Sequence, residues 1–233
     1  MVRHARCWIL ATMLALPLAP AAAQGKPGTA TAAGIVYNAP ERGTFDRGLD
    51  ISLRGMGEWP RVSAIAPDHV GRTISDQPAL YWFISRRSPV RVEITVTDPA
   101  SGKAVIKESI ARAEPGFHRF SLAAHNLKLA VGHEYLWSVA VVWDDAQRTR
   151  DVISQGALMR IEPPADIAAR LPALAGDERA RSLAAKGIWY DAISALSEAI
   201  EARPADAALR ALRASLLEQA GLKDAAAFDK RAR

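Results

Sequence analysis

The stretch KGIWYDAISALSEAIEARP, residues 186–204, predicts one amphipathic helix with a defined start and end. Apolar side chains recur in it at the spacing that places residues on one face of a helix. These apolar residues are Trp189, Ala192, Ile193, Leu196 and Ile200. Gly187 allows a sharp turn before the helix. Pro204 ends the helix, because proline lacks an amide hydrogen and its ring clashes with the preceding turn.

A second glycine–alanine pair favours a repeat. Ala192 follows Gly187 by five residues, and Ala226 follows Gly221 by five residues. The two pairs are 34 residues apart, which is the tetratricopeptide period. Small residues at these positions let paired helices approach closely, and the glycine makes the turn between them. The alternative is a generic alanine-rich helical hairpin, since only about one and a half repeats are present.

Upstream of Pro163 the helical spacing gives way to the alternation that is typical of β-strands. Apolar and polar residues alternate in VRVEITVT (90–97) and in EYLWSVAVVW (134–143), whereas ALYWFIS (79–85) is apolar on both faces. About seven such strands, separated by turn signals at a spacing of about ten residues, are typical of a sandwich. We therefore predict a β-sandwich of the immunoglobulin or fibronectin type, followed by an α-helical, tetratricopeptide-like tail.

The segment Leu129-x-x-Gly132-x-x-Tyr135 supports this fold class. In Greek-key sandwiches, a tyrosine near the start of the penultimate strand bonds upstream backbone through its hydroxyl group, an arrangement called the tyrosine corner. Gly132 would allow the close approach, and Leu129 would pack under the ring. The residues that we expect to be structural are Leu129, Gly132, Tyr135, Trp137, Gly187, Trp189, Ala192 and Gly221.

These patterns predict four parts of the chain. Residues 1–23 are expected to be a signal peptide, and residues 24–60 an extended, partly disordered arm rich in glycine and proline. Residues 61–162 are expected to form the β-sandwich domain. Residues 165–233 are expected to form the helical tail, after Pro163 and Pro164.

The tail and the sandwich each have apolar surface that they cannot bury alone. One and a half helical repeats are too few to cover their own apolar sides, and a strand that is apolar on both faces needs a cover. We therefore expect the tail to dock on the sandwich with Trp189, Ile193 and Leu196 buried. The rival arrangement leaves Tyr81 and Phe83 available to a partner protein while the tail moves freely.

The first residues have the composition of a secretory signal peptide. Arg3 and Arg6 precede an apolar run over residues 8–18, and the small residues Ala21-Ala22-Ala23 follow. We expect cleavage after Ala23 and a periplasmic or secreted mature protein. The apolar run is short for a membrane span, and no span is expected after cleavage. The alternative is a retained N-terminal anchor.

Cleavage would also remove the only cysteine and two of the basic residues. Cys7 is the only cysteine, so we expect a mature chain without a disulfide bond or a thiolate ligand. The mature chain would carry 28 basic and 25 acidic residues, a net charge of +3 that is spread evenly along its length. Nucleic-acid binding requires a concentrated basic patch, so no nucleic-acid partner is expected.

Several segments resemble a known family. The stretches VYNAPERG (36–43), APDHVGRTISDQPALYWFIS (66–85) and GIWYDAI (187–193), with the strand that contains Tyr135 and Trp137, are similar to the bacterial domain-of-unknown-function family numbered 928. The resemblance covers roughly residues 36–225. It implies an exported protein with a β-sandwich and a helical tail, and it implies no activity.

Common catalytic and cofactor-binding motifs are absent from the sequence. It contains no G-x-S-x-G elbow, no phosphate loop, no dinucleotide fingerprint and no H-E-x-x-H zinc motif. The histidines of the mature chain are expected to be structural or solvated; they are His69, His118, His125 and His133. We therefore expect no catalytic residue, no cofactor and no metal ion.

Two classes of function remain. The sequence favours an exported, non-catalytic binding or assembly module whose partner is another envelope or secreted protein, with the oligomeric state left open. The alternative is an envelope-acting hydrolase whose site is assembled from distant residues. The candidate recognition surface is the loop WDDAQRTRD (143–151), because sandwich loops often carry recognition; an ordinary solvated hairpin is its alternative. The residues proposed to bind the partner are Trp143, Asp144, Asp145, Arg148 and Arg150.

Overall fold

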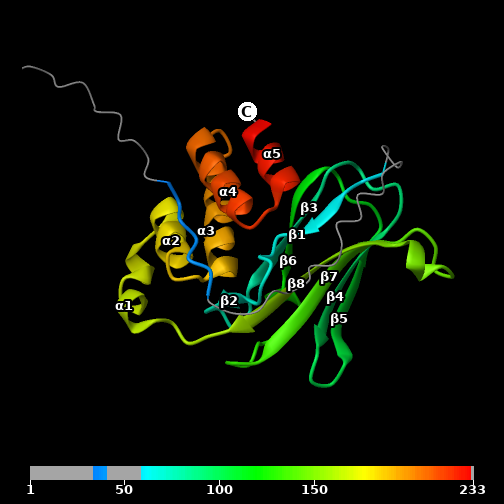
Figure 1. The fold of residues 1–233 in the computed structure, drawn as a ribbon, viewed down its shortest axis with the longest axis horizontal. Coiled ribbons are helices and arrows are strands. Elements are labelled where there is room, and N and C mark those ends of the chain that lie inside the picture. Colours follow the sequence, from blue (N-terminus) through cyan, green and yellow to red (C-terminus); the bar gives the residue numbers. More distant parts are fainter. Residues whose placement is uncertain (1–33, 41–58, 232–233) are drawn as a thin grey trace, which may run out of the picture. The chain divides into compact units, whose positions relative to one another are not determined.

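The computed structural model of the chain describes residues 34–40 and 59–231. The expected signal peptide and most of the expected arm lie outside the described residues. The described residues form two sheets, with eight strands, followed by five α-helices. Figure 1 shows the strands preceding a group of helices at the C-terminal end of the chain. A strand-rich region with a helical tail is therefore the observed architecture.

The smaller sheet has three strands in the order β1-β3-β6: β1 (Val62–Ala64), β3 (Ala79–Ile84) and β6 (Gly116–Ser121). Strand β3 pairs antiparallel with both neighbours, and Phe83 lies opposite Phe117 on β6. Every residue of β3 is buried. The sequence ALYWFIS therefore forms a central strand that is covered on both faces.

The larger sheet has five strands in the order β2-β8-β7-β4-β5: β2 (Gly71–Thr73), β8 (Val152–Arg160), β7 (Glu134–Val141), β4 (Val92–Asp98) and β5 (Lys103–Ile110). Strand β2 pairs parallel with β8, and the other pairs are antiparallel. On β7 the side chains of Tyr135, Trp137, Val139 and Val141 are buried, as the alternation predicts. The described residues contain eight strands where about seven were expected, and two of the eight, β1 and β2, have only three residues each.

The helical segment begins after Pro164. Its helices are α1 (Ala165–Ala168), α2 (Gly176–Ala184), α3 (Trp189–Ala202), α4 (Ala207–Gln219) and α5 (Lys223–Arg231). Short 3₁₀ turns occur at Ala123–His125, Arg148–Arg150 and Leu171–Ala173. The side chain of Asp206 caps α4 by accepting hydrogen bonds from the amides of Ala208 and Leu209. No helix among the described residues is both long enough and apolar enough to cross a bilayer.

Helix α3 docks on the sheets. It contacts β2 and β3, and its residues Trp189, Ile193 and Leu196 are buried. The indole nitrogen Nε1 of Trp189 donates a hydrogen bond of 2.9 Å to the carbonyl oxygen of Ile65, which lies between β1 and β2. The expectation that the tail docks on the strands is confirmed, and the freely moving tail is not observed.

A buried ion pair joins α4 to α5, and side chains of both helices contact the smaller sheet. The guanidinium group of Arg213 on α4 binds both carboxylate oxygens of Asp229 on α5, each at 2.7 Å. The same guanidinium group lies 3.9 Å from the centre of the Phe117 ring on β6. Phe228 of α5 also packs against Phe83 and Phe117. These contacts cover the Phe83 side of β3, for which the sequence analysis expected a cover.

Candidate functional site

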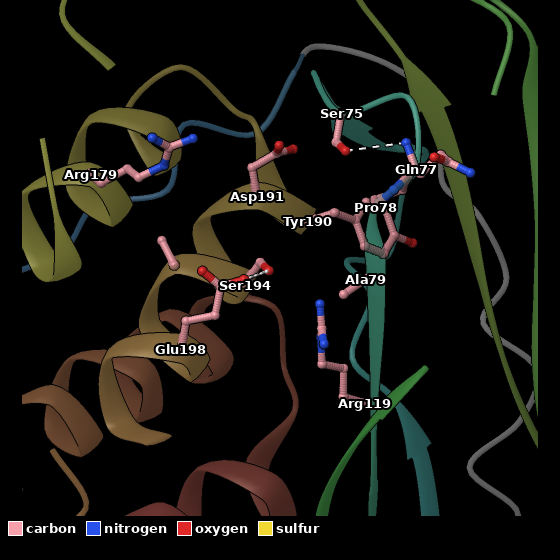
Figure 2. A pocket seen from close by; sticks show the side chains of 11 residues that line it. Ser75, Gln77, Pro78, Ala79, Arg119, Arg179, Tyr190, Asp191, Ser194 and Glu198 are labelled. Carbon is pink, nitrogen blue, oxygen red and sulfur yellow. Dashed lines mark hydrogen bonds between the residues drawn. The ribbon is translucent and has the colours of Figure 1, made fainter. Parts of the chain in front are cut away.

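A solvent-open pocket lies where helix α3 faces the start of strand β3 (Figure 2). Its volume is about 220 Å³. Helix α3, the loop before β3, strand β6 and helix α2 all contribute to its wall. The lining residues are Ser75, Gln77, Pro78, Ala79, Arg119, Arg179, Tyr190, Asp191, Ser194, Ala195 and Glu198.

The helical period explains why one face of α3 is polar at this pocket. Asp191, Ser194 and Glu198 are separated by three and four residues, so their side chains project from the same side of the helix. The apolar residues Ile193 and Leu196 project elsewhere and are buried. The packing of α3 on the sheets therefore presents its polar face to the pocket.

Asp191 connects the helix to the loop that precedes β3. Its Oδ2 atom accepts a hydrogen bond of 3.1 Å from the amide of Ile74. Burial raises the pKa of the Asp191 carboxyl group, and hydrogen bonds from the Thr73 side chain and the Ile74 amide lower it in part. The Asp191 side chain therefore holds helix α3 to the loop before β3. Burial favours the protonated form of its carboxyl group.

Two arginine side chains bring positive charge to the pocket. Arg179 on α2 donates a hydrogen bond of 3.0 Å from Nη1 to the carbonyl oxygen of Leu171. Arg119 on β6 is exposed, and its side chain makes no hydrogen bond or ion pair with any side chain that the structure describes, although its charge lowers in part the raised pKa of the nearby Tyr81 hydroxyl. Figure 2 shows Arg119 entering the pocket from the strand side. Its guanidinium donors are available to a ligand.

The remaining polar groups bond to close neighbours. Ser194 donates a hydrogen bond of 2.9 Å to Oε1 of Glu198, and the hydroxyl oxygen of Ser75 accepts a bond of 3.2 Å from the Gln77 amide. Glu198 pairs with a neutral hydroxyl group and stays exposed. The pocket thus offers both signs of charge and several hydroxyl groups, which is suited to binding a polar, charged group.

An Asp–His–Tyr row lies nearby, on α3's N-terminal side. A hydrogen bond of 2.7 Å joins His69 Nε2 to the Tyr37 hydroxyl group, and one of 3.1 Å joins His69 Nδ1 to Asp68 Oδ1. Burial raises the pKa of the Tyr37 hydroxyl well above its usual range. The tyrosine therefore stays protonated at neutral pH and is not an activated nucleophile.

The other histidines each contact an aromatic ring and one polar group. His118 stacks on Trp82 at 4.2 Å between ring centres. His125 pairs with Glu108 at 2.7 Å, and His133 pairs with Asp98 at 2.9 Å. Within residues 34–40 and 59–231, no group of three or more His, Cys, Asp or Glu residues is placed to hold a metal ion.

The loop of residues 143–151 is largely engaged in contacts with strand β4 and its neighbours. Nη1 of Arg91 donates a hydrogen bond of 2.6 Å to Asp145, and this arginine holds the pKa of the Asp145 carboxyl below its usual value. Arg148 binds Glu93 at 2.9 Å and Asp151 at 2.6 Å. Asp145 and Arg148 therefore have structural partners in the protein.

The other three residues proposed for this loop differ in exposure. The Trp143 ring contacts Trp59 edge-on, with 3.7 Å between ring centres. Asp144 accepts a bond of 2.8 Å from the Ala146 amide. Arg150 is exposed and has no ion pair with the described residues. A partner-binding role for the loop stays a prediction.

The residues expected to be structural lie in contact with backbone or in the core. The hydroxyl of Tyr135 lies 3.4 Å from the amide of Ala130, and Leu129 is buried. Gly132 donates from its amide to the carbonyl oxygen of Arg160 at 2.8 Å. In the helical segment, Ala192 is fully buried. Gly187 lies between α2 and α3, and Gly221 lies between α4 and α5.

The pocket was not identified from the sequence. The polar face of α3 could have been found from the spacing of Asp191, Ser194 and Glu198. Arg119 and Arg179 carry no comparable signal, because they come from a strand and a helix 60 residues apart in the chain. Only the docking of the tail brings them to one surface.

Comparison with known proteins identifies the family and no activity. No curated protein matches the chain. A family model described as Domain of Unknown Function (DUF928) matches residues 47–229, which is most of the chain and includes all eight strands and the pocket. The chain therefore belongs to the DUF928 family.

Proposed function

We propose that the protein is an exported, non-catalytic binding or assembly module that uses the α3 pocket to hold an acidic group of another envelope or secreted protein. Export rests on the signal-peptide composition of residues 1–23. In this proposal the strands are an immunoglobulin-like or fibronectin-like sandwich that serves as a scaffold. The contact between Tyr135 and the Ala130 amide supports that fold type.

The helices are, in the same proposal, a tetratricopeptide-like pair of hairpins. The pairs α2–α3 and α4–α5 each turn at a glycine, and the two glycines, Gly187 and Gly221, are 34 residues apart. Helical hairpins of this kind offer surfaces for other polypeptides. This supports a module that holds a partner.

One observation supports the pocket as the binding site. The Arg119 side chain projects into it without an ion pair among the described residues, although the pocket also contains two carboxylates. A guanidinium group binds carboxylates through two parallel hydrogen bonds. An acidic side chain or chain terminus of a partner would therefore satisfy the Arg119 guanidinium group, and Ser75 and Gln77 line the same pocket.

The test is capture of the partner by a tagged mature protein purified from its own cell envelope. The wild type is compared with Arg119→Ala and with Arg112→Ala, a matched exposed arginine outside the pocket. We expect one co-purified protein to be lost with Arg119→Ala and kept with Arg112→Ala. The purified pair should then bind in solution with the same dependence on Arg119.

Two results would contradict the proposal. Equal recovery of every co-purified protein with both variants would exclude the pocket as the binding site. Fractionation of cells that finds the protein only in the cytoplasm would exclude export.

The alternative, an envelope-acting hydrolase, has one observation in its favour. Asp191, whose pKa is raised by burial, and Glu198 line the same pocket. Two carboxyl groups in one pocket, one of them with a raised pKa, are the groups that glycoside hydrolysis uses. If the protein is such an enzyme, Asp191→Asn and Glu198→Gln should each abolish release of soluble fragments from isolated envelope material while partner capture persists.

A further inference from the structure

The α3 pocket contains two opposite charges that do not neutralise each other. Figure 2 shows that Arg119 enters the pocket from the strand side, whereas Glu198 projects from α3. Both side chains are exposed, and neither belongs to an ion pair within the part of the chain that the structure describes. The Glu198 carboxylate accepts one hydrogen bond of 2.9 Å, from the neutral Ser194 hydroxyl. Opposite charges that are held apart on different elements are complementary to a ligand that carries both signs of charge.

The other two ionisable groups of the pocket already have partners in the protein. Oδ2 of Asp191 accepts a hydrogen bond of 3.1 Å from a backbone amide of the loop before β3, and burial raises the pKa of this carboxyl group. Nη1 of Arg179 donates a hydrogen bond of 3.0 Å to a backbone carbonyl oxygen. Arg119 and Glu198 are therefore the charged groups that a ligand can bind.

A buried hydroxyl group lies beside these two charges. Tyr81 on β3 is the register partner of Arg119 on β6, so their side chains project from the same face of the smaller sheet. Tyr81 is 3% exposed, and its hydroxyl oxygen makes no hydrogen bond of ordinary geometry with the described residues, although the Ser194 hydroxyl lies close to it. Burial raises the pKa of the Tyr81 hydroxyl, which therefore keeps its proton. Buried polar groups normally have a partner, so this hydroxyl is suited to donate to an anion in the pocket.

The size of the pocket favours a ligand as small as a single amino acid. Its volume of about 220 Å³ is below the range of about 300–1,000 Å³ that is typical of pockets for drug-sized ligands. Three apolar residues line the same pocket: Pro78, Ala79 and Ala195. They would contact a small apolar side chain of the ligand.

We propose that the α3 pocket binds a free α-amino acid with a small, uncharged side chain, whose α-carboxylate contacts Arg119 and the Tyr81 hydroxyl and whose α-ammonium group contacts Glu198. A guanidinium group binds a carboxylate through two parallel hydrogen bonds, and a carboxylate accepts hydrogen bonds from an ammonium group. An amino acid carries both groups on the same carbon atom, whereas a residue within a polypeptide does not. The proposal rests on the function proposed above in one respect, the binding of a carboxylate by Arg119.

The first test uses ligand analogues on the purified mature wild-type protein, with no partner present. NMR titration of the isotope-labelled protein detects binding of small ligands even at millimolar affinity. The probes are L-alanine, propionate, which lacks the ammonium group, and L-alaninamide, which lacks the carboxylate. We expect L-alanine to bind about tenfold or more tightly than either analogue, because each analogue loses a hydrogen bond between charged groups.

Two variants then assign each group of the ligand to its residue. Glu198→Gln should weaken L-alanine about tenfold and leave propionate unchanged, since propionate has no ammonium group. Arg119→Ala should weaken L-alanine and propionate but not L-alaninamide. The matched controls are Glu162→Gln and Arg112→Ala, which change exposed residues outside the pocket and should bind all three ligands as the wild type does. Circular dichroism establishes first that every variant keeps its helices and strands.

Two results would overturn the proposal. One is the absence of binding by L-alanine, L-serine and L-valine at millimolar concentration. The other is an equal loss of L-alanine and propionate binding in Glu198→Gln, because the ammonium group would then not be recognised. Partner capture is measured without any amino acid, so it can succeed where this test fails, and Arg119 would then bind only the acidic group of a protein. Amino-acid binding beside unchanged partner recovery in Arg119→Ala would contradict the earlier function and support this one.

Discussion

The indole nitrogen of Trp137 on β7 donates a hydrogen bond of 3.0 Å to the hydroxyl group of Tyr190 on α3. The Tyr190 hydroxyl in turn donates a bond of 2.9 Å to the carbonyl oxygen of Ala157 on β8. All three residues are buried. Burial raises the pKa of the Tyr190 hydroxyl, and the bond from Trp137 lowers it in part, so the hydroxyl keeps its proton at neutral pH. One side chain of the helical segment thus provides hydrogen-bond partners for buried polar groups on two strands, the indole N–H on β7 and the carbonyl oxygen on β8.

Replacing Tyr190 with Phe should lower the free energy of unfolding by about 1–3 kcal/mol, because the Trp137 nitrogen and the Ala157 oxygen lose a buried partner. Urea denaturation measures the change. Tyr135→Phe is the comparison, since its hydroxyl makes one long contact of 3.4 Å with the Ala130 amide; we expect about 1 kcal/mol there. An unchanged stability in Tyr190→Phe would show that the bond does not hold the helix to the sheet.

Gly71→Ala should destabilise the protein by about 1–3 kcal/mol, because an added methyl group has no room. Its Cβ atom would lie 2.6 Å from Cε2 of Tyr190, a ring that is fixed by two hydrogen bonds, and 3.2 Å from Pro67. Gly34→Ala is the matched control, since nothing lies within 4 Å of its Cβ position. Equal melting temperatures for the two variants would mean that α3 is not packed on β2.

Asp229→Ala should cost about 3–5 kcal/mol, because it leaves the buried Arg213 guanidinium without its counter-charge. Replacing both residues by apolar ones, Arg213→Met with Asp229→Leu, should cost less than the single change. Denaturation of the wild type, Arg213→Met, Asp229→Leu and the double variant measures the coupling. Additive losses in the double variant would contradict a buried ion pair.

Much of the fold follows from the sequence because its signals are local. The periodic apolar residues after Gly187 and the stop at Pro204 predict α3, which spans Trp189–Ala202. The alternation in VRVEITVT predicts β4 in the same way, since one face is buried. Strands β1 and β2 escaped prediction, because three residues cannot show an alternating pattern.

The candidate site depends on contacts between distant segments, which leave no local signal. Arg119 belongs to an ordinary alternating strand, and its position at the pocket depends on where α3 docks. The sequence did predict the docking, from the apolar character of both faces of residues 79–85, but not its orientation. The partners of Asp145 and Arg148 could not be predicted either, because the pairing of β4 with β7 places Arg91, just before β4, and Glu93, on β4, beside the loop.

Asp191→Asn should make the protein more stable than the wild type at neutral pH. Burial raises the pKa of the Asp191 carboxyl in the folded protein, whereas in the unfolded chain it titrates near about 3.9. The folded state therefore binds more protons than the unfolded state between the two pKa values, and wild-type stability falls as the pH rises through that window. An asparagine side chain keeps an oxygen acceptor for the Ile74 amide without this loss.

The measurement is urea denaturation of both proteins between about pH 3 and pH 7. The difference in unfolding free energy should be small at the acid end, grow through the window and then stay constant. Comparing the two proteins at each pH cancels the carboxyl groups whose pKa values are lowered, such as Asp98 and Asp145. A difference that does not vary with pH would contradict the raised pKa.

The pocket and the core both require that the helical segment be folded onto the strands as one cooperative unit. Differential scanning calorimetry of the mature chain, beside a shorter chain of residues 24–162, tests this directly. We expect a single transition in the mature chain and a clearly lower melting temperature, or no transition, in the shorter one, because the latter loses the cover of β3 and the partner of Trp137. Two independent transitions in the mature chain, with the shorter chain melting at an unchanged temperature, would contradict the docked arrangement.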